Sequence, residues 1–178
     1  MMSNQEKTGG LLRGTTPKPI RIRLIWGTPE GEKIKNILQS KLDIYYQLCI
    51  ENDFKPGFFE TKDAEKIFTI YTSSTEEIVK TWFLISANEP SAIVVCDQAS
   101  LDFLAENKIT LKRWLKPNLK LIALGFEPDL SELDLPTGKL ITHCPAGVDK
   151  TEFLPLITPP LPTQVEPNRN RYSNCTVM

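Results

Sequence analysis

The 178-residue chain is predicted to be a three-layer α/β protein, with helices on both faces of a five-stranded parallel sheet. Segments rich in β-branched residues alternate along the chain with segments whose apolar residues recur at helical spacing. Two of the strand-like segments are continuous apolar runs, which is typical of parallel strands buried on both faces. Hydrophobic residues make up 40% of the chain and charged residues 24%, the balance of a globular domain.

The first elements are a strand and a long helix. Residues 20–26 alternate in polarity and then become wholly apolar, which predicts a strand. Thr28 suits the N-cap of a helix and Pro29 its first position, and apolar residues follow at helical spacing. The pattern predicts a helix of about five turns that ends at Asn52. Residues 58–59, two phenylalanines, are either a short strand or a packed loop.

The later elements continue the alternation of strands and helices. In chain order, we expect a strand at 67–72, a helix from Ser74 or Thr75 to Pro90, a strand at 92–96, a helix at 99–115, a strand at 119–124, a strand at 140–142 and a helix at 148–157. Such alternation predicts parallel strands joined by right-handed crossovers, in flavodoxin-like order.

The chain divides into one domain and two polar tails. Residues 1–19 contain glycines and prolines and predict a flexible leader. Residues 20–158 form the α/β domain. Residues 159–178 are rich in proline and predict a stiff, extended tail.

Composition excludes several classes of function. A net charge of −1 argues against a basic stripe, so no direct nucleic-acid partner is expected. The single histidine, His143, excludes metal sites built from several histidines, and we expect neither a metal nor a cofactor. No apolar run is long enough to span a bilayer. The four scattered cysteines predict reduced thiols in a cytoplasmic protein.

Candidate functional residues follow from the predicted sheet. In this kind of sheet, the functional crevice lies at the carboxyl ends of the strands. The residues expected there are Trp26, Gly27, Ser73, Asp97, Gly125, His143 and Cys144.

The middle of the domain resembles a response-regulator receiver domain. The similarity runs from Phe68 through a Ser/Thr-capped helix to the buried strand that ends at Asp97. Residues 121–124 resemble the family's fourth strand, and Cys144-Pro145 with residues 148–154 resembles its Lys-Pro turn and last helix. The resemblance implies that Asp97 occupies the phospho-acceptor position. It also implies signal transduction, with a partner protein bound through the last strand and helix.

The chain departs from the receiver pattern at the residues that support phosphorylation. Phosphoryl transfer to an aspartate needs Mg²⁺, and receivers place paired acids for it after the first strand, where this chain has Trp26 and Gly27. The hydroxyl position falls near Gly125, and the lysine before the proline is replaced by Cys144. We therefore predict a pseudo-receiver, a non-enzymatic regulatory module that acts by protein–protein binding. The alternative role for Asp97 is to cap the helix that follows.

A second hypothesis makes the protein an enzyme. Residues 143–151, which begin His-Cys and end Lys-Thr, resemble the signature of cysteine-dependent phosphatases, HCx5R[ST]. The resemblance implies that the Cys144 thiolate is the nucleophile. Lys150 replaces the arginine of the signature, and lysine cannot hold a phosphate through two parallel hydrogen bonds.

The last four residues, Cys175 to Met178, fit the prenylation pattern C-a-a-X, and the terminal methionine favours farnesyl. A third hypothesis is therefore a prenylated adaptor or effector that is peripherally attached to a membrane through Cys175. A single lipid gives only marginal attachment. The alternative is a coincidental cysteine in the tail.

Overall fold

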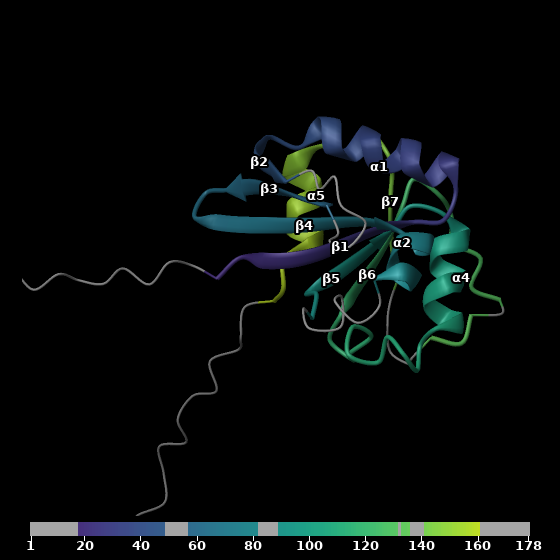
Figure 1. Ribbon diagram of the computed structural model, residues 1–178. Coiled ribbons are helices and arrows are strands. Elements are labelled where there is room, and N and C mark those ends of the chain that lie inside the picture. The colour runs from purple at the N-terminus through teal and green to yellow at the C-terminus, as the bar shows by residue number, and fades with distance from the viewer. Residues whose placement is uncertain (1–17, 49–56, 82–88, 132, 136–140, 161–178) are drawn as a thin grey trace, which may run out of the picture.

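Seven strands form one sheet in the order β2-β3-β4-β1-β5-β6-β7 (Figure 1). This computed structural model describes residues 18–48, 57–81, 89–131, 133–135 and 141–160. The strands are β1 (Ile20–Trp26), β2 (Ile44–Leu48), β3 (Gly57–Asp63), β4 (Lys66–Ser74), β5 (Ala92–Val95), β6 (Lys120–Leu124) and β7 (Ile141–Cys144). The helices in this part of the chain are α1 (Pro29–Lys41), α2 (Thr75–Lys80), α4 (Gln98–Glu106) and α5 (Lys150–Ile157).

The predicted α/β class is confirmed, but the predicted number of strands is wrong. Five strands, in the order β4-β1-β5-β6-β7, are parallel, and this order is compatible with the flavodoxin-like arrangement. Two further strands, β2 and β3, extend the sheet beyond β4 with antiparallel pairing. A hairpin joins β3 to β4, and Ala64 in its turn has a positive φ of 51°.

The predicted helix to Asn52 is wrong at its C-terminal end. Helix α1 stops at Lys41, Leu42 is extended, and the chain returns as β2. The apolar spacing of this segment fits a helix, but isoleucine and tyrosine side chains pack well on a pleated sheet. In β2, Tyr46 gains a cross-strand aromatic neighbour in Phe58 of β3, which stabilises the strand. Residues 49–52 lie outside the described part.

Three other predicted boundaries need correction. Helix α4 ends at Glu106 instead of reaching Leu115, because the Asn107 side chain donates a hydrogen bond to the Phe103 carbonyl and the chain then continues as turns. Helix α5 begins at Lys150, two residues later than predicted. Helix α2 ends at Lys80, so the second predicted helix does not continue unbroken to Pro90; residues 82–88 lie outside the described part.

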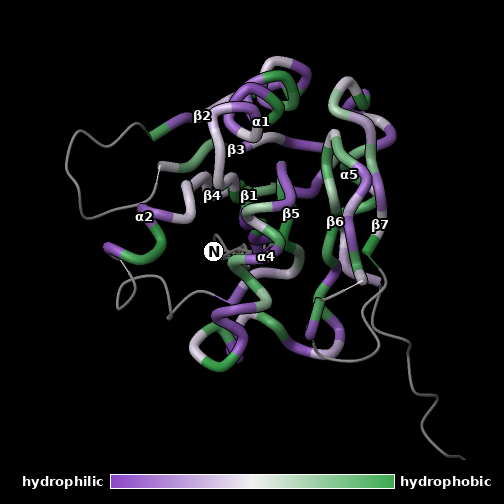
Figure 2. The backbone as a smooth tube through the Cα atoms, turned by 90° about the vertical axis from the view of Figure 1, so that its right-hand side faces the viewer, coloured by the Kyte–Doolittle hydropathy of each residue, from purple (hydrophilic) through white to green (hydrophobic). Residues whose placement is uncertain are grey.

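The sheet separates two hydrophobic cores. On one face, α1 and α5 cover β1, β5 and β6 with Leu38 and Phe153 among the buried residues. On the other face, α2 and α4 pack with Ile78, Leu101 and Leu104 buried. Every residue of β5 is buried, and Figure 2 shows β6 mostly in the hydrophobic colour. The continuous apolar runs in the sequence are therefore the strands that both helical layers cover.

The predicted leader and tail lie almost wholly outside the described residues, which begin at 18 and end at 160. No helix in the described ranges combines the length and apolar composition needed to cross a membrane.

Candidate functional site

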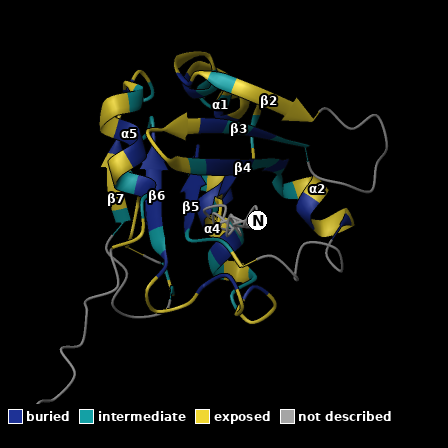
Figure 3. Ribbon diagram, turned by 90° about the vertical axis from the view of Figure 1, so that its left-hand side faces the viewer, coloured by how far each residue is buried: buried dark blue, intermediate teal, exposed yellow. Residues whose placement is uncertain are grey.

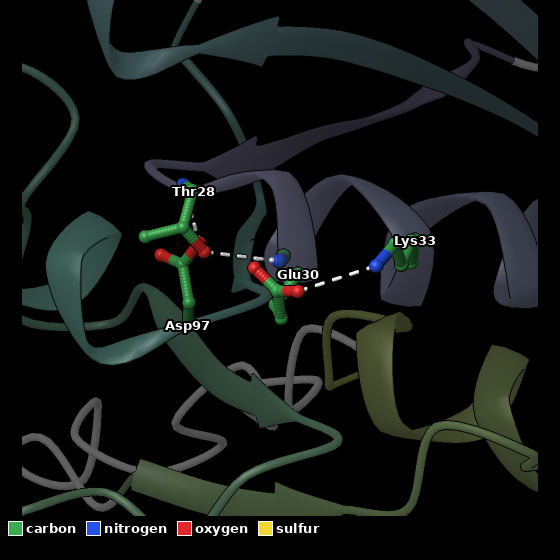
Figure 4. Close-up of polar contacts among 5 residues, drawn as sticks. Thr28, Glu30, Lys33 and Asp97 are labelled. Carbon is green, nitrogen blue, oxygen red and sulfur yellow. Dashed lines mark hydrogen bonds and ion pairs between the residues drawn. The ribbon is translucent and has the colours of Figure 1, made fainter.

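Asp97 lies at the carboxyl end of β5, beside the turn that joins β1 to α1. Its carboxylate accepts a hydrogen bond from the backbone of Gly27 at both oxygens, at 3.1 Å to Oδ1 and 2.9 Å to Oδ2. Thr28 donates to Oδ2 twice, from its backbone N and its hydroxyl, both at 2.8 Å. Ser100 N donates to Oδ1 at 2.7 Å. Both oxygens are therefore engaged by the protein itself, and Figure 4 shows Thr28 beside the carboxylate.

These contacts make Asp97 the junction of two helix N-termini. It is the N-cap of α4, where it forms a capping box with Ser100. Thr28, the N-cap of α1, links Asp97 to this helix: its hydroxyl donates a hydrogen bond to Asp97 and accepts one from Gly31 N at 3.1 Å. The carboxylate thus lies at the positive end of α1, the place where many α/β proteins bind a phosphate. In this protein, the negative charge at the N-terminus of α1 is the Asp97 carboxylate itself.

Gly31 lets the first turn of α1 approach this carboxylate. A Cβ atom on Gly31 would lie 2.0 Å from Oδ2 of Asp97 and 2.7 Å from its Cγ. No side chain fits in that space. A glycine so early in an amphipathic helix is explained by this close approach and not by a turn.

The electrostatics of Asp97 favour its charged form. Burial alone would raise its pKa, because the side chain is 9% exposed. The hydrogen bonds donated by Gly27, Ser100 and Thr28 outweigh burial and hold the pKa below its ordinary value. The geometry suits a permanent structural carboxylate. It leaves neither oxygen free to attack a phosphoryl donor.

The other predicted crevice residues lie at the expected strand ends but do not surround Asp97 with acids. The Trp26 ring is covered by Lys35, whose Nζ is 4.8 Å from the ring centroid. Glu30, at the start of α1, pairs with Lys33 at 3.2 Å (Figure 4). Gly125 adopts a positive φ of 77° and donates a 2.7 Å hydrogen bond to the Cys144 carbonyl. In the described part of the chain, no three His, Cys, Asp or Glu side chains could together hold a metal ion.

His143 and Cys144 point to opposite faces of the sheet. Successive residues of a strand alternate in direction, and β7 follows this rule. Cys144 is buried in the core beneath α1 and α5, whereas His143 is exposed and pairs in register with Ala123 of the other core. The imidazole therefore does not face the thiol as a general base would.

Lys150 does not lie over the thiol either. Its Nζ is 3.0 Å from Oδ2 of Asp43, so it joins the start of α5 to the segment between α1 and β2. Burial, followed by the charge of Glu152, raises the pKa of Cys144, so the thiol stays protonated at neutral pH. The arrangement is that of a packed structural cysteine.

We predict that Cys144 reacts slowly with alkylating reagents. At pH 8, iodoacetamide should modify it at least about 100-fold more slowly in the native protein than in urea, because only the exposed thiolate reacts. Cys96, which is fully buried and whose pKa burial also raises, is the internal comparison. Peptide mass spectrometry separates the four thiols. Faster labelling of Cys144 in the native protein than in urea would contradict the structural role.

A second candidate surface lies on the sheet face that also carries α2 and α4, at its β2 edge. We call it the open aromatic surface; its residues are Tyr45, Tyr46, Leu48, Phe58 and Tyr71. Tyr45 and Tyr46 are each 47% exposed, and β2 is drawn almost entirely as exposed in Figure 3. The Phe58 ring centroid lies 5.9 Å from that of Tyr46 and 5.5 Å from that of Tyr71. The rings thus form a row across three strands.

Charged groups border the open aromatic surface. The Nζ of Lys62 lies 4.0 Å from the Tyr45 ring centroid, and the Tyr45 hydroxyl donates to Glu60. Contiguous aromatic surface with a polar rim is typical of protein-binding sites. Sequence reasoning missed this surface because the apolar spacing of residues 44–48 predicts a helix where the structure has β2. Sequence reasoning also missed Thr28 and Ser100 as hydrogen-bond donors to Asp97. The sequence signal for both is their position at the start of a helix, Thr28 at α1 and Ser100 at α4.

A scan of protein-family models finds no match to this chain, and neither does a search of curated proteins. The receiver resemblance therefore remains a hypothesis based on element order and on Asp97. Cys175, the predicted lipid attachment site, lies outside the described residues.

Proposed function

We propose that the protein is a non-enzymatic signalling module, a pseudo-receiver, which binds a partner protein through the open aromatic surface. The observation that carries the proposal is the row of Tyr46, Phe58 and Tyr71, with Tyr45 and Leu48 beside it. Aromatic residues are enriched in the cores of protein interfaces, because they contribute large contact area with few rotatable bonds.

The Asp97 network supports the non-enzymatic part of this proposal. In a working switch, the strand-end crevice must admit a phosphoryl group and a metal ion. In this chain the equivalent space is filled by the carboxylate of Asp97 and by the backbone of Gly27, Thr28 and Gly31. The network instead fixes the β1–α1 and β5–α4 junctions, which gives a rigid scaffold beneath the binding face.

The position of the exposed apolar side chains favours the β2 edge over the last strand and helix as the binding region. Tyr45, Tyr46 and Leu48 are adjacent on one strand and at least 36% exposed, whereas Phe153, Leu154 and Ile157 of α5 are buried. A partner that covers the β2 edge would remove aromatic area from water, which favours association.

The double substitution of Tyr45 and Tyr46 by serine should abolish partner binding while leaving the fold intact. Both tyrosines are half-exposed, so their loss costs little core packing. The measurement is quantitative crosslinking mass spectrometry of the full chain expressed in its native cells. The matched control replaces Ile109 and Leu130, which are 80% and 52% exposed on other parts of the molecule.

Partners that are lost in the tyrosine variant and retained in the Ile109/Leu130 variant are the expected result. Partners captured equally by both variants, or by neither, would overturn the assignment of this surface.

A further inference from the structure

Three buried donors without partners are clustered on one face of the sheet. Among the described residues, four buried side-chain polar atoms lack a hydrogen-bond partner, and three of them are Nη1 of Arg23, Oγ of Ser73 and Nε1 of Trp114. Arg23 is opposite Tyr71 in the β1–β4 register, and Ser73 is two residues further along β4, on the same face. The Trp114 ring centroid is 4.7 Å from Cζ of Arg23. The fourth atom, in Thr61, lies on the opposite face, in register with Phe68.

Arg23 is a buried cation without a carboxylate partner. Its side chain is 2% exposed, and none of the ion pairs between described residues includes it. The rings of Tyr71 and Trp114, each 4.7 Å from Cζ, stabilise the charge by cation–π contact. Rings provide no oxygen acceptor in the plane of the guanidinium, and Nη1 of Arg23 has no hydrogen-bond partner. Buried charges are otherwise paired and hydrogen-bonded in proteins.

The chemistry of the cluster selects its ligand. A guanidinium, an indole N–H and a hydroxyl can all donate, and the guanidinium adds a positive charge. Such a set is complementary to an oxyanion. Because two aromatic rings already contact the guanidinium, the ligand must approach its N–H edge, and a planar carboxylate matches that edge with two parallel hydrogen bonds.

We propose that Arg23, Ser73 and Trp114 form a binding site for a carboxylate group. Tyr71, whose ring contacts the Arg23 guanidinium, is only partly buried and belongs to the open aromatic surface. The carboxylate belongs either to a small organic acid or to an acidic side chain of a bound peptide. The site stands on its own donors and does not depend on the partner protein proposed above.

The test titrates the ¹⁵N-labelled full chain with sodium acetate at pH 7 and constant ionic strength. The signal is the indole N–H resonance of Trp114, assigned with Trp114→Phe. A saturable shift is expected in the wild type and in the matched control Arg21→Met, an exposed arginine on the same strand. Arg23→Met should weaken acetate binding at least about tenfold, and inorganic phosphate should bind more weakly than acetate. No saturable shift, or an equal shift in Arg23→Met, would overturn the proposal.

A blocked tripeptide with a central glutamate, compared with its glutamine counterpart, identifies the source of the carboxylate. Tighter binding of the glutamate peptide than of acetate indicates an acidic side chain, whereas binding of acetate alone indicates a small acid. Binding of neither contradicts the site. If Arg23→Met does not fold, Arg23→Lys takes its place. Arg23→Lys keeps the positive charge but lacks the planar guanidinium that can donate two parallel hydrogen bonds. Relative to the wild type, it should reduce the acetate-induced rise in melting temperature by at least half.

Discussion

Asp97→Asn will lower the free energy of unfolding by about 3 kcal/mol, because it removes a buried carboxylate from donors that stay in place. The backbone N–H groups of Gly27, Thr28 and Ser100 all point at the carboxylate, and the Thr28 hydroxyl also donates to it. The amide group of asparagine would turn an N–H group toward at least one of these donors. Urea unfolding followed by circular dichroism measures the loss.

The control for this substitution is Asp129→Asn. Asp129 also accepts hydrogen bonds, from the backbone and hydroxyl of Ser131, but it is exposed. Its replacement should change stability by less than about 0.5 kcal/mol. Equal losses at the two positions would mean that the Asp97 network contributes nothing beyond an ordinary surface turn.

The stabilisation that Asp97 gives the folded protein should decrease only toward acid pH. Its pKa is lower in the folded protein than in the unfolded chain, so its contribution is fully present above the ordinary carboxyl pKa of about 4. The contribution is lost as the pH falls through the folded pKa. The stability difference between wild type and Asp97→Asn should therefore be constant from pH 8 to about pH 5 and shrink below about pH 4. A difference that grows toward acid pH would contradict the lowered pKa.

Gly31→Ala is expected to destabilise the protein by about 3 kcal/mol, although alanine normally stabilises a helix relative to glycine by up to about 1 kcal/mol. The sign reverses because the added methyl group would lie 2.0 Å from Oδ2 of Asp97. Helix α1 must shift away from β5, and the hydrogen bonds of Gly27 and Thr28 to Asp97 lengthen as a result. Thermal and urea unfolding both report the change.

Gly147→Ala provides the comparison for the Gly31 substitution. No atom lies within 4 Å of the place where a Cβ would be added to Gly147, and its φ is not in the left-handed region. This substitution should be neutral or slightly stabilising, since alanine restricts the unfolded chain. A stabilising Gly31→Ala would show that α1 does not approach Asp97 as closely as the structure places it.

The sequence was sufficient to predict the parallel part of the sheet because its signals are local. The run Ala92–Val95 is wholly apolar and ends at a helix-capping aspartate, and the structure buries all four residues between two helical layers. Thr28 and Pro29 mark the start of α1 for equally local reasons, namely an N-cap hydroxyl and a preset φ.

The antiparallel extension could not be predicted in this way because it depends on a distant partner. Tyr45 and Leu48 continue the helical spacing of α1, and only pairing with Phe58 and Phe59 decides for a strand. The same limit applies to the site. Asp97 is visible as a candidate from its place after a strand, but all of its donors except Ser100 come from a turn about 70 residues away. The unpaired donors of Arg23 and Trp114 arise from tertiary packing, which spacing alone does not encode.

The central position of β1 determines when the domain can form during synthesis. Of the seven described strands, β1 is made first, yet both of its neighbours, β4 and β5, are made much later, and Asp97 fixes its final turn across 70 residues of chain. Contacts this far apart slow folding, because loop closure precedes any gain from pairing. The apolar residues Ile22, Leu24 and Ile25 therefore lack part of their native cover on the nascent chain until β5 is made.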